Sequence, residues 1–222
     1  MCGRYTLLAD ELKIRQRFDI PYEIDNYHPN YNIAPSQQVL AVIHDGKNRR
    51  AGYLRWGLVP SWAKDEKIGN KMINARSETA HVKPSFRNLM ARRRCLVIAD
   101  SFYEWQMTEE GKIPKRIQLE NRELFAFAGL WDKWQQGDKT LFTCTLLTKD
   151  SNTFMKSIHH RMPIILPKDK EEIWIKQSFA NAKEARHFLN SFEMDPLTAY
   201  SVSDFVNNVK NNDVQCIEPL TK

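Results

Sequence analysis

The stretch VLAVIH-DGKN-RRAGYLRW, residues 39–56, holds the clearest hairpin signal in the chain. Asp-Gly favours the tight turn of a β-hairpin, because glycine adopts positive φ at no steric cost. The run 39–44 is rich in β-branched residues, and the run 49–56 carries two aromatic residues; both kinds of residue favour strands. This stretch therefore predicts two antiparallel strands.

Elsewhere in the chain, further apolar runs are similar in length to the two runs of this hairpin. Strands are predicted at RCLVIAD (94–100), KRIQLE (115–120), LFAFAGLW (124–131) and LFTCTLLT (141–148). Helices are predicted at 7–18, 85–93, 168–177 and 181–192, and the proline-marked residues 21–37 are expected to form an extended loop.

The strands cluster along the chain and do not alternate regularly with helices. That order favours an α+β fold over a parallel α/β fold. We expect one domain, residues 1–222, with a central antiparallel or mixed, barrel-like sheet flanked by helices. A chain of 222 residues is long enough to bury a core without metal or disulfide support.

Composition sets the broad class. The 33 Lys and Arg against 27 Asp and Glu give a net charge of +6, a mild excess that is compatible with a polyanionic partner. There is neither an apolar run of membrane-spanning length nor a signal peptide, so we expect a cytoplasmic protein with free thiols. The four cysteines form no C-x-x-C pair, and the histidines show no zinc spacing, so neither a metal nor a cofactor is expected.

The first residues, MCGRYT, place a thiol next to the initiator methionine. If Met1 is removed, Cys2 carries an α-amine and a thiol, both with nucleophilic forms near neutral pH. Such an aminothiol condenses with an aldehyde and closes a five-membered thiazolidine ring, or it serves as an N-terminal nucleophile in a hydrolase. A small residue without chemical function is an equally open interpretation of Cys2 alone.

Two further segments offer polar groups on one face if they are extended. Arg4 would share a face with Cys2, where it could lower the thiol pKa or hold a phosphate, although a surface arginine is the simpler interpretation. In MINARSE (72–78), Asn74 could orient a reacting group and Arg76 could bind phosphate. The alternative is a turn and N-cap before a short helix.

A carboxylate stands between two aromatic residues in DSFYEW (100–105). Glu104, flanked by Tyr103 and Trp105, would be desolvated and suited to proton donation, unless it points to solvent from the strand end.

Two other motifs also suggest a site. In SIHHRMP (157–163), a histidine could move protons and Arg161 could contact phosphate, or both could complement a helix C-terminus. Trp62 could stack on a nucleobase, although most tryptophans pack in cores.

Together these motifs resemble one family. The order MCGRYT, YNIAPSQ, WGLVPSWAKD, INARSET, CLVIADSFYEW, AFAGLW, IHHRMPIIL and NNVKNN, running nearly end to end, is similar to the SOS-response-associated peptidase (SRAP) proteins, also described as abasic-site shields.

The resemblance implies a mechanism. Met1 would be removed, autocatalytically or by an aminopeptidase, and Cys2 would form a thiazolidine crosslink with the aldehyde of an abasic site in single-stranded DNA, with lyase-like chemistry. Asn74 would orient the reacting group, Glu104 would donate and accept protons, and His159, which the pattern I-H-x-R-M-P selects over His160, would assist proton transfer.

The resemblance also implies the DNA contacts. Phosphates would be gripped by Arg4, Arg76 and Arg161, while Pro35, Ser36 and Trp62 would border the nucleotide channel. We expect a monomer that associates with the nucleoid when it is on DNA, and no membrane partner.

Two other functions compete with this one. A glutamine amidotransferase-like hydrolase also begins Met-Cys-Gly, but such chains usually continue with an apolar residue, where this one has Arg4, and carry an Asn-Gly motif that is absent here. A non-covalent reader of modified DNA bases would need Cys2 only as a structural residue.

Overall fold

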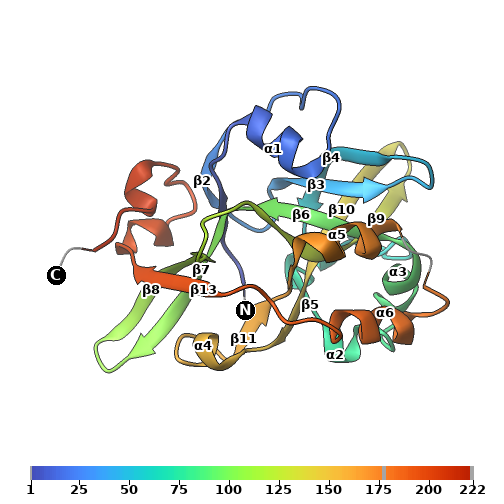
Figure 1. Ribbon diagram of the computed structural model, residues 1–222. Coiled ribbons are helices and arrows are strands. Elements are labelled where there is room, and N and C mark those ends of the chain that lie inside the picture. Colours follow the sequence, from blue (N-terminus) through green and yellow to red (C-terminus); the bar gives the residue numbers. More distant parts are fainter. Residues whose placement is uncertain (1, 177–178, 221–222) are drawn as a thin grey trace.

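The computed structural model describes residues 2–176 and 179–220, and it contains two β-sheets with helices around them (Figure 1). One sheet has eight strands and the other has five. The sheets are joined where β6 (Arg94–Ala99) passes directly into β7 (Ser101–Thr108). The predicted α+β class with a barrel-like sheet is confirmed.

Five strands of the larger sheet close on themselves. In addition to β6 they are β3 (Gln38–His44), β4 (Arg49–Trp56), β9 (Phe125–Gln136) and β10 (Lys139–Asp150). The ring runs β10-β4-β3-β6-β9 and returns to β10, and only the β4–β10 pairing is parallel. The predicted hairpin forms β3 and β4, and every other strand of the ring was also predicted.

Three short strands extend this barrel. β5 (Asn74–Arg76) runs parallel to β10, while β11 (Arg161–Pro163) runs antiparallel to β10. β12 (Ile165–Leu166) pairs with β9. Because β5 and β11 both lie along the end of β10, segments far apart in the sequence meet there.

The five-stranded sheet is antiparallel throughout. Its order is β13 (Leu197–Ser201), β8 (Gly111–Leu119), β7, β1 (Tyr5–Leu7) and β2 (Asn30–Ile33). β1 lies between β7 and β2, so the N-terminus runs into the middle of the molecule (Figure 1).

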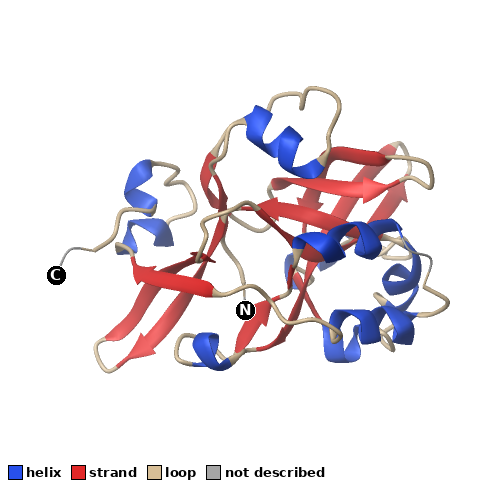
Figure 2. Ribbon diagram, in the orientation of Figure 1, coloured by secondary structure: helices blue, strands red, loops and turns tan. Residues whose placement is uncertain are grey.

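Short helices lie around the sheets (Figure 2). The α-helices are α1 (Glu11–Phe18), α2 (Ser77–Ala80), α3 (Arg87–Arg92), α4 (Thr153–Lys156), α5 (Lys168–Lys176) and α6 (Ala182–Leu189), and the 3-10 turns are η1 (Glu66–Lys71), η2 (Asp204–Asn207) and η3 (Val214–Cys216). The side chains of Asp10 and Asn181 cap α1 and α6. Across the described residues, each helix is too short or too polar to cross a bilayer.

The sequence-based boundaries are wrong at two places near the N-terminus. Leu7 lies in β1 and pairs with Asn30, so the helix predicted from residue 7 begins only at Glu11. The predicted loop at 21–37 contains β2, whose partner is β1. Both strands are short, and only their pairing with each other identifies them.

The two sheets share one hydrophobic core. Tyr5 of the smaller sheet packs against Trp56 and Phe127 of the barrel, with ring centroids 5.5 and 5.7 Å apart. Phe102 of β7 contacts Phe127 as well. Aromatic side chains of this size contribute a large share of the buried apolar area, so the contact fixes the smaller sheet on the barrel.

Candidate functional site

Pairing between β1 and β7 brings the N-terminal residues to Glu104. Tyr5 is opposite Phe102, and the Tyr103 N–H donates to the Arg4 carbonyl at 2.9 Å. The antiparallel chain before Tyr5 therefore runs past Glu104. Cys2 is fully buried there.

Asn74 lies on β5 and contacts Cys2 directly. Its Nδ2 donates to the Cys2 carbonyl oxygen at 2.8 Å. Its Oδ1 is buried and accepts no hydrogen bond from any described residue. A buried acceptor without a partner is costly, so this oxygen is available to a donor that enters the site.

Glu104 and His159 form the next pair of groups. Glu104 projects from β7 and is only 3% exposed, as the flanking rings predicted. His159 Nδ1 lies 4.0 Å from Glu104 Oε1. The Arg161 N–H lies 3.0 Å from the same nitrogen, and the His159 ring stacks on His160 with centroids 4.3 Å apart, so the imidazole is held in place.

The surroundings of Cys2 disfavour the thiolate form. Burial raises the pKa of Cys2 far above its ordinary value, and the charge of Glu104 raises it further. Arg4 contributes through its backbone carbonyl, which accepts from the Cys2 thiol at 3.9 Å, and not through its guanidinium. This hydrogen bond from the thiol lowers the pKa of Cys2, but burial outweighs it.

A pocket of about 600 Å³ opens beside Glu104 and His159. It is lined by Glu104, Trp105, Met107, Lys112, Lys156, Ser157, Ile158, His159 and His160. Met107 is 68% exposed, and Lys112 and Lys156 are also exposed. The pocket thus combines a buried acid and an imidazole with apolar surfaces and two cations.

Sequence reasoning missed Met107, Lys112 and Lys156. The β7–β8 pairing places Lys112 opposite Met107, and Lys156 ends α4. An exposed methionine on a strand was the available signal, but only the pairing of β7 with β8 shows which residues join it.

The structure gives Arg4 an internal role. Its guanidinium donates to Asn32 Oδ1 and to the Val206 carbonyl, both at 2.7 Å, and to the Asn207 carbonyl at 3.3 Å. It also lies over the Trp105 ring, 5.7 Å from the centroid. Arg4 therefore joins β1 to the C-terminal segment, and its contact with phosphate stays a prediction.

Arg161 is likewise occupied by neighbouring groups. It donates to both carboxylate oxygens of Glu78 at 2.8 and 2.9 Å, and to Asp150 at 2.5 Å. Its side chain is buried. This cluster joins α2, β10 and β11 next to His159 and so helps to hold that part of the site in place. The contact of Arg161 with phosphate stays a prediction.

The other predicted DNA contacts lie on separate elements. Arg76 is exposed at the end of β5, two residues from Asn74 as expected of an extended segment, and α2 follows it. Pro35 and the exposed Ser36 form the turn between β2 and β3. The exposed Trp62 lines a different pocket, with Arg92, Arg93 and Asp132.

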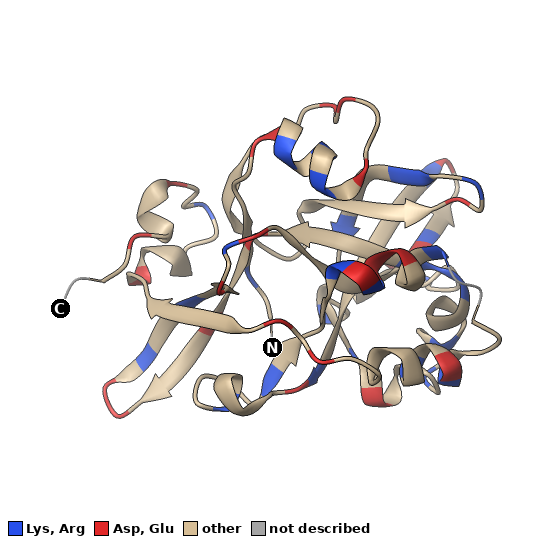
Figure 3. Cartoon of the chain, in the orientation of Figure 1, with Lys and Arg blue, Asp and Glu red and all other residues tan. Residues whose placement is uncertain are grey.

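Basic residues do not gather on one element. Lys and Arg are spread over both sheets and the helices (Figure 3). The described residues contain no group of three His, Cys, Asp or Glu side chains arranged to hold a metal ion.

The fold and these residues define a protein class. The chain belongs to the SOS response associated peptidase (SRAP) family, whose model matches residues 1–209. The predicted family is thus confirmed.

Individual relatives agree with this assignment. The chain is 47% identical over 222 residues to the abasic site processing protein YoqW of Bacillus subtilis (strain 168), covering 98% of this chain and 99% of that protein. It is 34% identical over 227 residues to the abasic site processing protein HMCES of Gallus gallus, covering 87% of this chain and 67% of that one.

A solved structure shares the fold. The crystal structure of a protein from Bacteroides thetaiotaomicron matches with a TM-score of 0.87 at 25% identity, covering 99% of this chain and 100% of that chain.

Proposed function

We propose that this protein binds abasic sites in single-stranded DNA and captures them covalently through Cys2. Relatives of nearly the same length are abasic site processing proteins, which supports abasic-site DNA as the substrate. The covalent step follows from the chemistry of Cys2 and its neighbours.

The reaction begins with removal of Met1, which frees the α-amine of Cys2. The ring-opened sugar of an abasic site presents an aldehyde at C1′. The amine adds to this carbon and expels water to form an imine, and the thiol then adds across the C=N bond while its proton passes to nitrogen. The product is a thiazolidine, and the balance is the loss of one water molecule. The second step is favoured because the thiol and the imine nitrogen belong to one residue, which makes ring closure intramolecular.

Neighbouring residues have separate roles in this scheme. Asn74 holds the Cys2 carbonyl through Nδ2, and its free Oδ1 is positioned to accept from the Cys2 amine or a sugar hydroxyl. Glu104 and His159, whose reactive atoms lie 4.0 Å apart, transfer the protons that imine formation and ring closure require.

The pocket beside these residues supplies the DNA contacts. Trp105 and Met107 offer surfaces for a base, and Lys112 and Lys156 offer charges for phosphates. Neutralised phosphates release counterions, so DNA affinity should fall as salt is added.

One observation carries the proposal: the 2.8 Å hydrogen bond between Asn74 and Cys2. It fixes the second residue of the chain within the same small region as a buried carboxylate and an imidazole. A merely structural cysteine has no need of a buried acid and an unpartnered amide oxygen beside it.

Intact-mass measurement tests the proposal. The purified protein is incubated with single-stranded DNA from which one uracil has been excised, and the expected species lacks Met1 and carries the DNA minus one water after denaturation. Cys2→Ala should give no stable adduct, whereas Cys216→Ser, at another buried thiol, should react as the wild type does.

Two further arms separate the steps. Methoxyamine blocks the aldehyde and should prevent the adduct, while Glu104→Gln should slow its formation or reversal. A Cys2→Ala protein that still forms a heat-stable adduct would refute capture by Cys2. Wild-type protein that binds abasic DNA without any adduct would leave the non-covalent reader as the function.

A further inference from the structure

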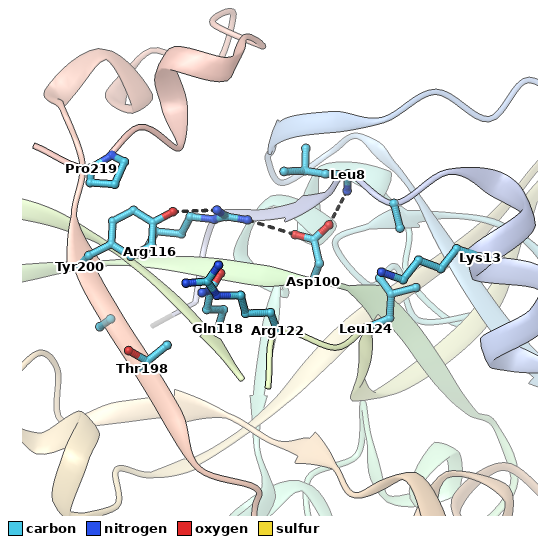
Figure 4. A pocket seen from close by; sticks show the side chains of 12 residues that line it. Leu8, Lys13, Asp100, Arg116, Gln118, Arg122, Leu124, Thr198, Tyr200 and Pro219 are labelled. Atoms are coloured by element: carbon cyan, nitrogen blue, oxygen red, sulfur yellow. Dashed lines mark hydrogen bonds and ion pairs between the residues drawn. The ribbon is translucent and has the colours of Figure 1, made fainter. Parts of the chain in front are cut away.

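A second pocket of about 660 Å³ lies between α1 and the five-stranded sheet (Figure 4). It is lined by Leu8, Ala9, Lys13, Asp100, Arg116, Gln118, Arg122, Leu124, Thr198, Ala199, Tyr200 and Pro219. None of these residues lines the pocket beside Glu104.

The register of the five-stranded sheet places Arg116 of the second pocket and Glu104 on opposite faces. Arg116 pairs with Tyr103 on one side and with Tyr200 on the other, so these three side chains share a face. Gln118, two residues further along β8, shares that face too. Glu104 is the next residue after Tyr103 and therefore projects from the opposite face.

The charges in the second pocket favour an anion. Lys13, Arg116 and Arg122 face a single carboxylate, Asp100, which leaves an excess of two positive charges. Asp100 already accepts from the Thr6 hydroxyl and the Leu8 N–H. Its negative charge is thus partly satisfied by the protein itself.

Arg116 is held in a fixed orientation within this pocket. Its Nε donates to Ser101 Oγ at 2.8 Å. Figure 4 shows its two other contacts: Nη1 donates to the Tyr200 hydroxyl at 2.7 Å, and Nη2 lies 3.6 Å from Asp100. A guanidinium that is already oriented loses little entropy when it binds an oxyanion.

Gln118 adds a polar group to the pocket. Its side chain lines the pocket, and the residue is 8% exposed. Its amide is not one of the buried polar groups that lack a partner; it lies at the pocket surface, where a ligand can reach it. The amide can donate to a phosphate oxygen or pair with a polar edge of a ligand.

We propose that this pocket binds the phosphate of a nucleotide, either free or at the phosphorylated end of a nucleic acid strand. The volume suits a small ligand. Lys13 and Arg122 contact the phosphate, Gln118 hydrogen bonds to the ligand, and Leu8, Leu124 and Pro219 pack against the sugar and base. This site needs neither Cys2 nor an abasic aldehyde, so it extends beyond the function proposed above.

Calorimetric titration tests the site with deoxyadenosine monophosphate, deoxyadenosine and inorganic phosphate. The monophosphate should bind and the nucleoside should bind at least about tenfold more weakly, because charge-assisted hydrogen bonds to phosphate are lost. Lys13→Gln combined with Arg122→Gln should weaken binding of the monophosphate by about tenfold or more, and Gln118→Leu should weaken it as well. Lys47→Gln, which removes an exposed charge in the β3–β4 turn, should leave it unchanged.

Short undamaged oligonucleotides with and without a 5′-phosphate distinguish the two sources. The 5′-phosphate should raise the affinity for the oligonucleotide if the site binds a strand end, and the Lys13/Arg122 variant should abolish this increase. Binding of the free nucleotide, without an effect of the 5′-phosphate on oligonucleotide affinity, assigns the site to the free nucleotide. Equal affinities for the nucleotide and the nucleoside would overturn the proposal. So would a loss of nucleotide affinity in Lys47→Gln as large as that in the Lys13/Arg122 variant. The Lys13/Arg122 variant should still form the Cys2 adduct, so failure of this site and failure of the proposed function are distinguishable.

Discussion

Asn74 is the residue on which the geometry of Cys2 most directly depends. It holds the Cys2 carbonyl from a different strand, and β5 is itself fixed by its parallel pairing with β10. The position of the thiol is thus coupled to the barrel and not to local sequence.

We expect Asn74→Ala to slow adduct formation about tenfold or more, because the Cys2 backbone loses its anchor and the near-attack geometry is populated less often. The measurement is the single-turnover rate of crosslinking to abasic single-stranded DNA. Asn48→Ala, at an exposed asparagine in the β3–β4 turn, is the matched control. Equal rates for Asn74→Ala and wild type would contradict the proposed role.

Gly129 is a second residue at which the structure limits the side chain, because a Cβ does not fit there. A Cβ at this position would lie 2.7 Å from Cys95 Sγ and 3.3 Å from the Thr145 carbonyl oxygen. The close approach of three barrel strands, β6, β9 and β10, leaves no room for a side chain.

Gly129→Ala should therefore lower the free energy of unfolding by about 1–3 kcal/mol, because overpacking forces the barrel strands apart. Urea unfolding monitored by tryptophan fluorescence measures this. Gly52→Ala, on β4 of the same barrel, meets nothing within 4 Å and should change stability much less. A Gly129 variant as stable as Gly52→Ala would show that the barrel accommodates the methyl group.

At the scale of elements, the ion cluster around Arg161 joins α2, β10 and β11. Burial raises the pKa of Glu78, but hydrogen bonds from Arg161 outweigh burial and hold this pKa below its ordinary value. A carboxylate with a lowered pKa in the folded state adds stability above its unfolded pKa, and this contribution is lost as the pH falls through the folded pKa.

We accordingly expect Glu78→Gln to cost about 1–2 kcal/mol of unfolding free energy at pH 7, a modest value because Glu78 is partly exposed. The difference from wild type should shrink below about pH 4.5, where the unfolded carboxyl begins to protonate. Denaturant unfolding at pH 7, 5 and 4 provides the measurement, with exposed Glu23→Gln as the control. A difference that is independent of pH would mean that the charge of Glu78 contributes nothing.

At the scale of the whole molecule, the two sheets share one core across Tyr5, Trp56 and Phe127. If the chain is a single domain, as predicted from the sequence, the two sheets unfold together because they share this core.

One cooperative transition is therefore expected, with the same midpoint by far-ultraviolet circular dichroism and by tryptophan fluorescence, and with equal calorimetric and van't Hoff enthalpies. Trp56 in the barrel and Trp105 in the smaller sheet report on separate parts of the molecule. Trp105→Phe removes the indole of the smaller sheet and leaves five tryptophans, of which Trp56, Trp131 and Trp134 lie on barrel strands. A fluorescence midpoint of this variant that differs from its circular dichroism midpoint would indicate two units that unfold separately.

All five barrel strands could be predicted from composition and turn chemistry, because long runs of β-branched and aromatic residues are distinctive. β1 and β2 could not, because strands of three and four residues are identified by their partners. Of the candidate site, Cys2, Asn74, Glu104 and His159 were selected from the sequence, and the structure brings Asn74 against Cys2 and His159 against Glu104.

The arginines show the limit of sequence reasoning most clearly. Arg4 and Arg161 carry the charge that phosphate recognition needs, yet both donate to oxygens within the protein. A sequence specifies the guanidinium but not the carbonyls and carboxylates that surround it, since those come from residues up to 203 positions away.

The sequence by itself determined which local elements form and which reactive groups are present, because turn chemistry, side-chain shape and the position of Cys2 beside Met1 are local properties. Tertiary structure alone decided which of those groups meet, which arginines are occupied, and that a second basic pocket exists behind the sheet. The physical reason is strand register: a pairing between distant segments sets the face on which every side chain lies.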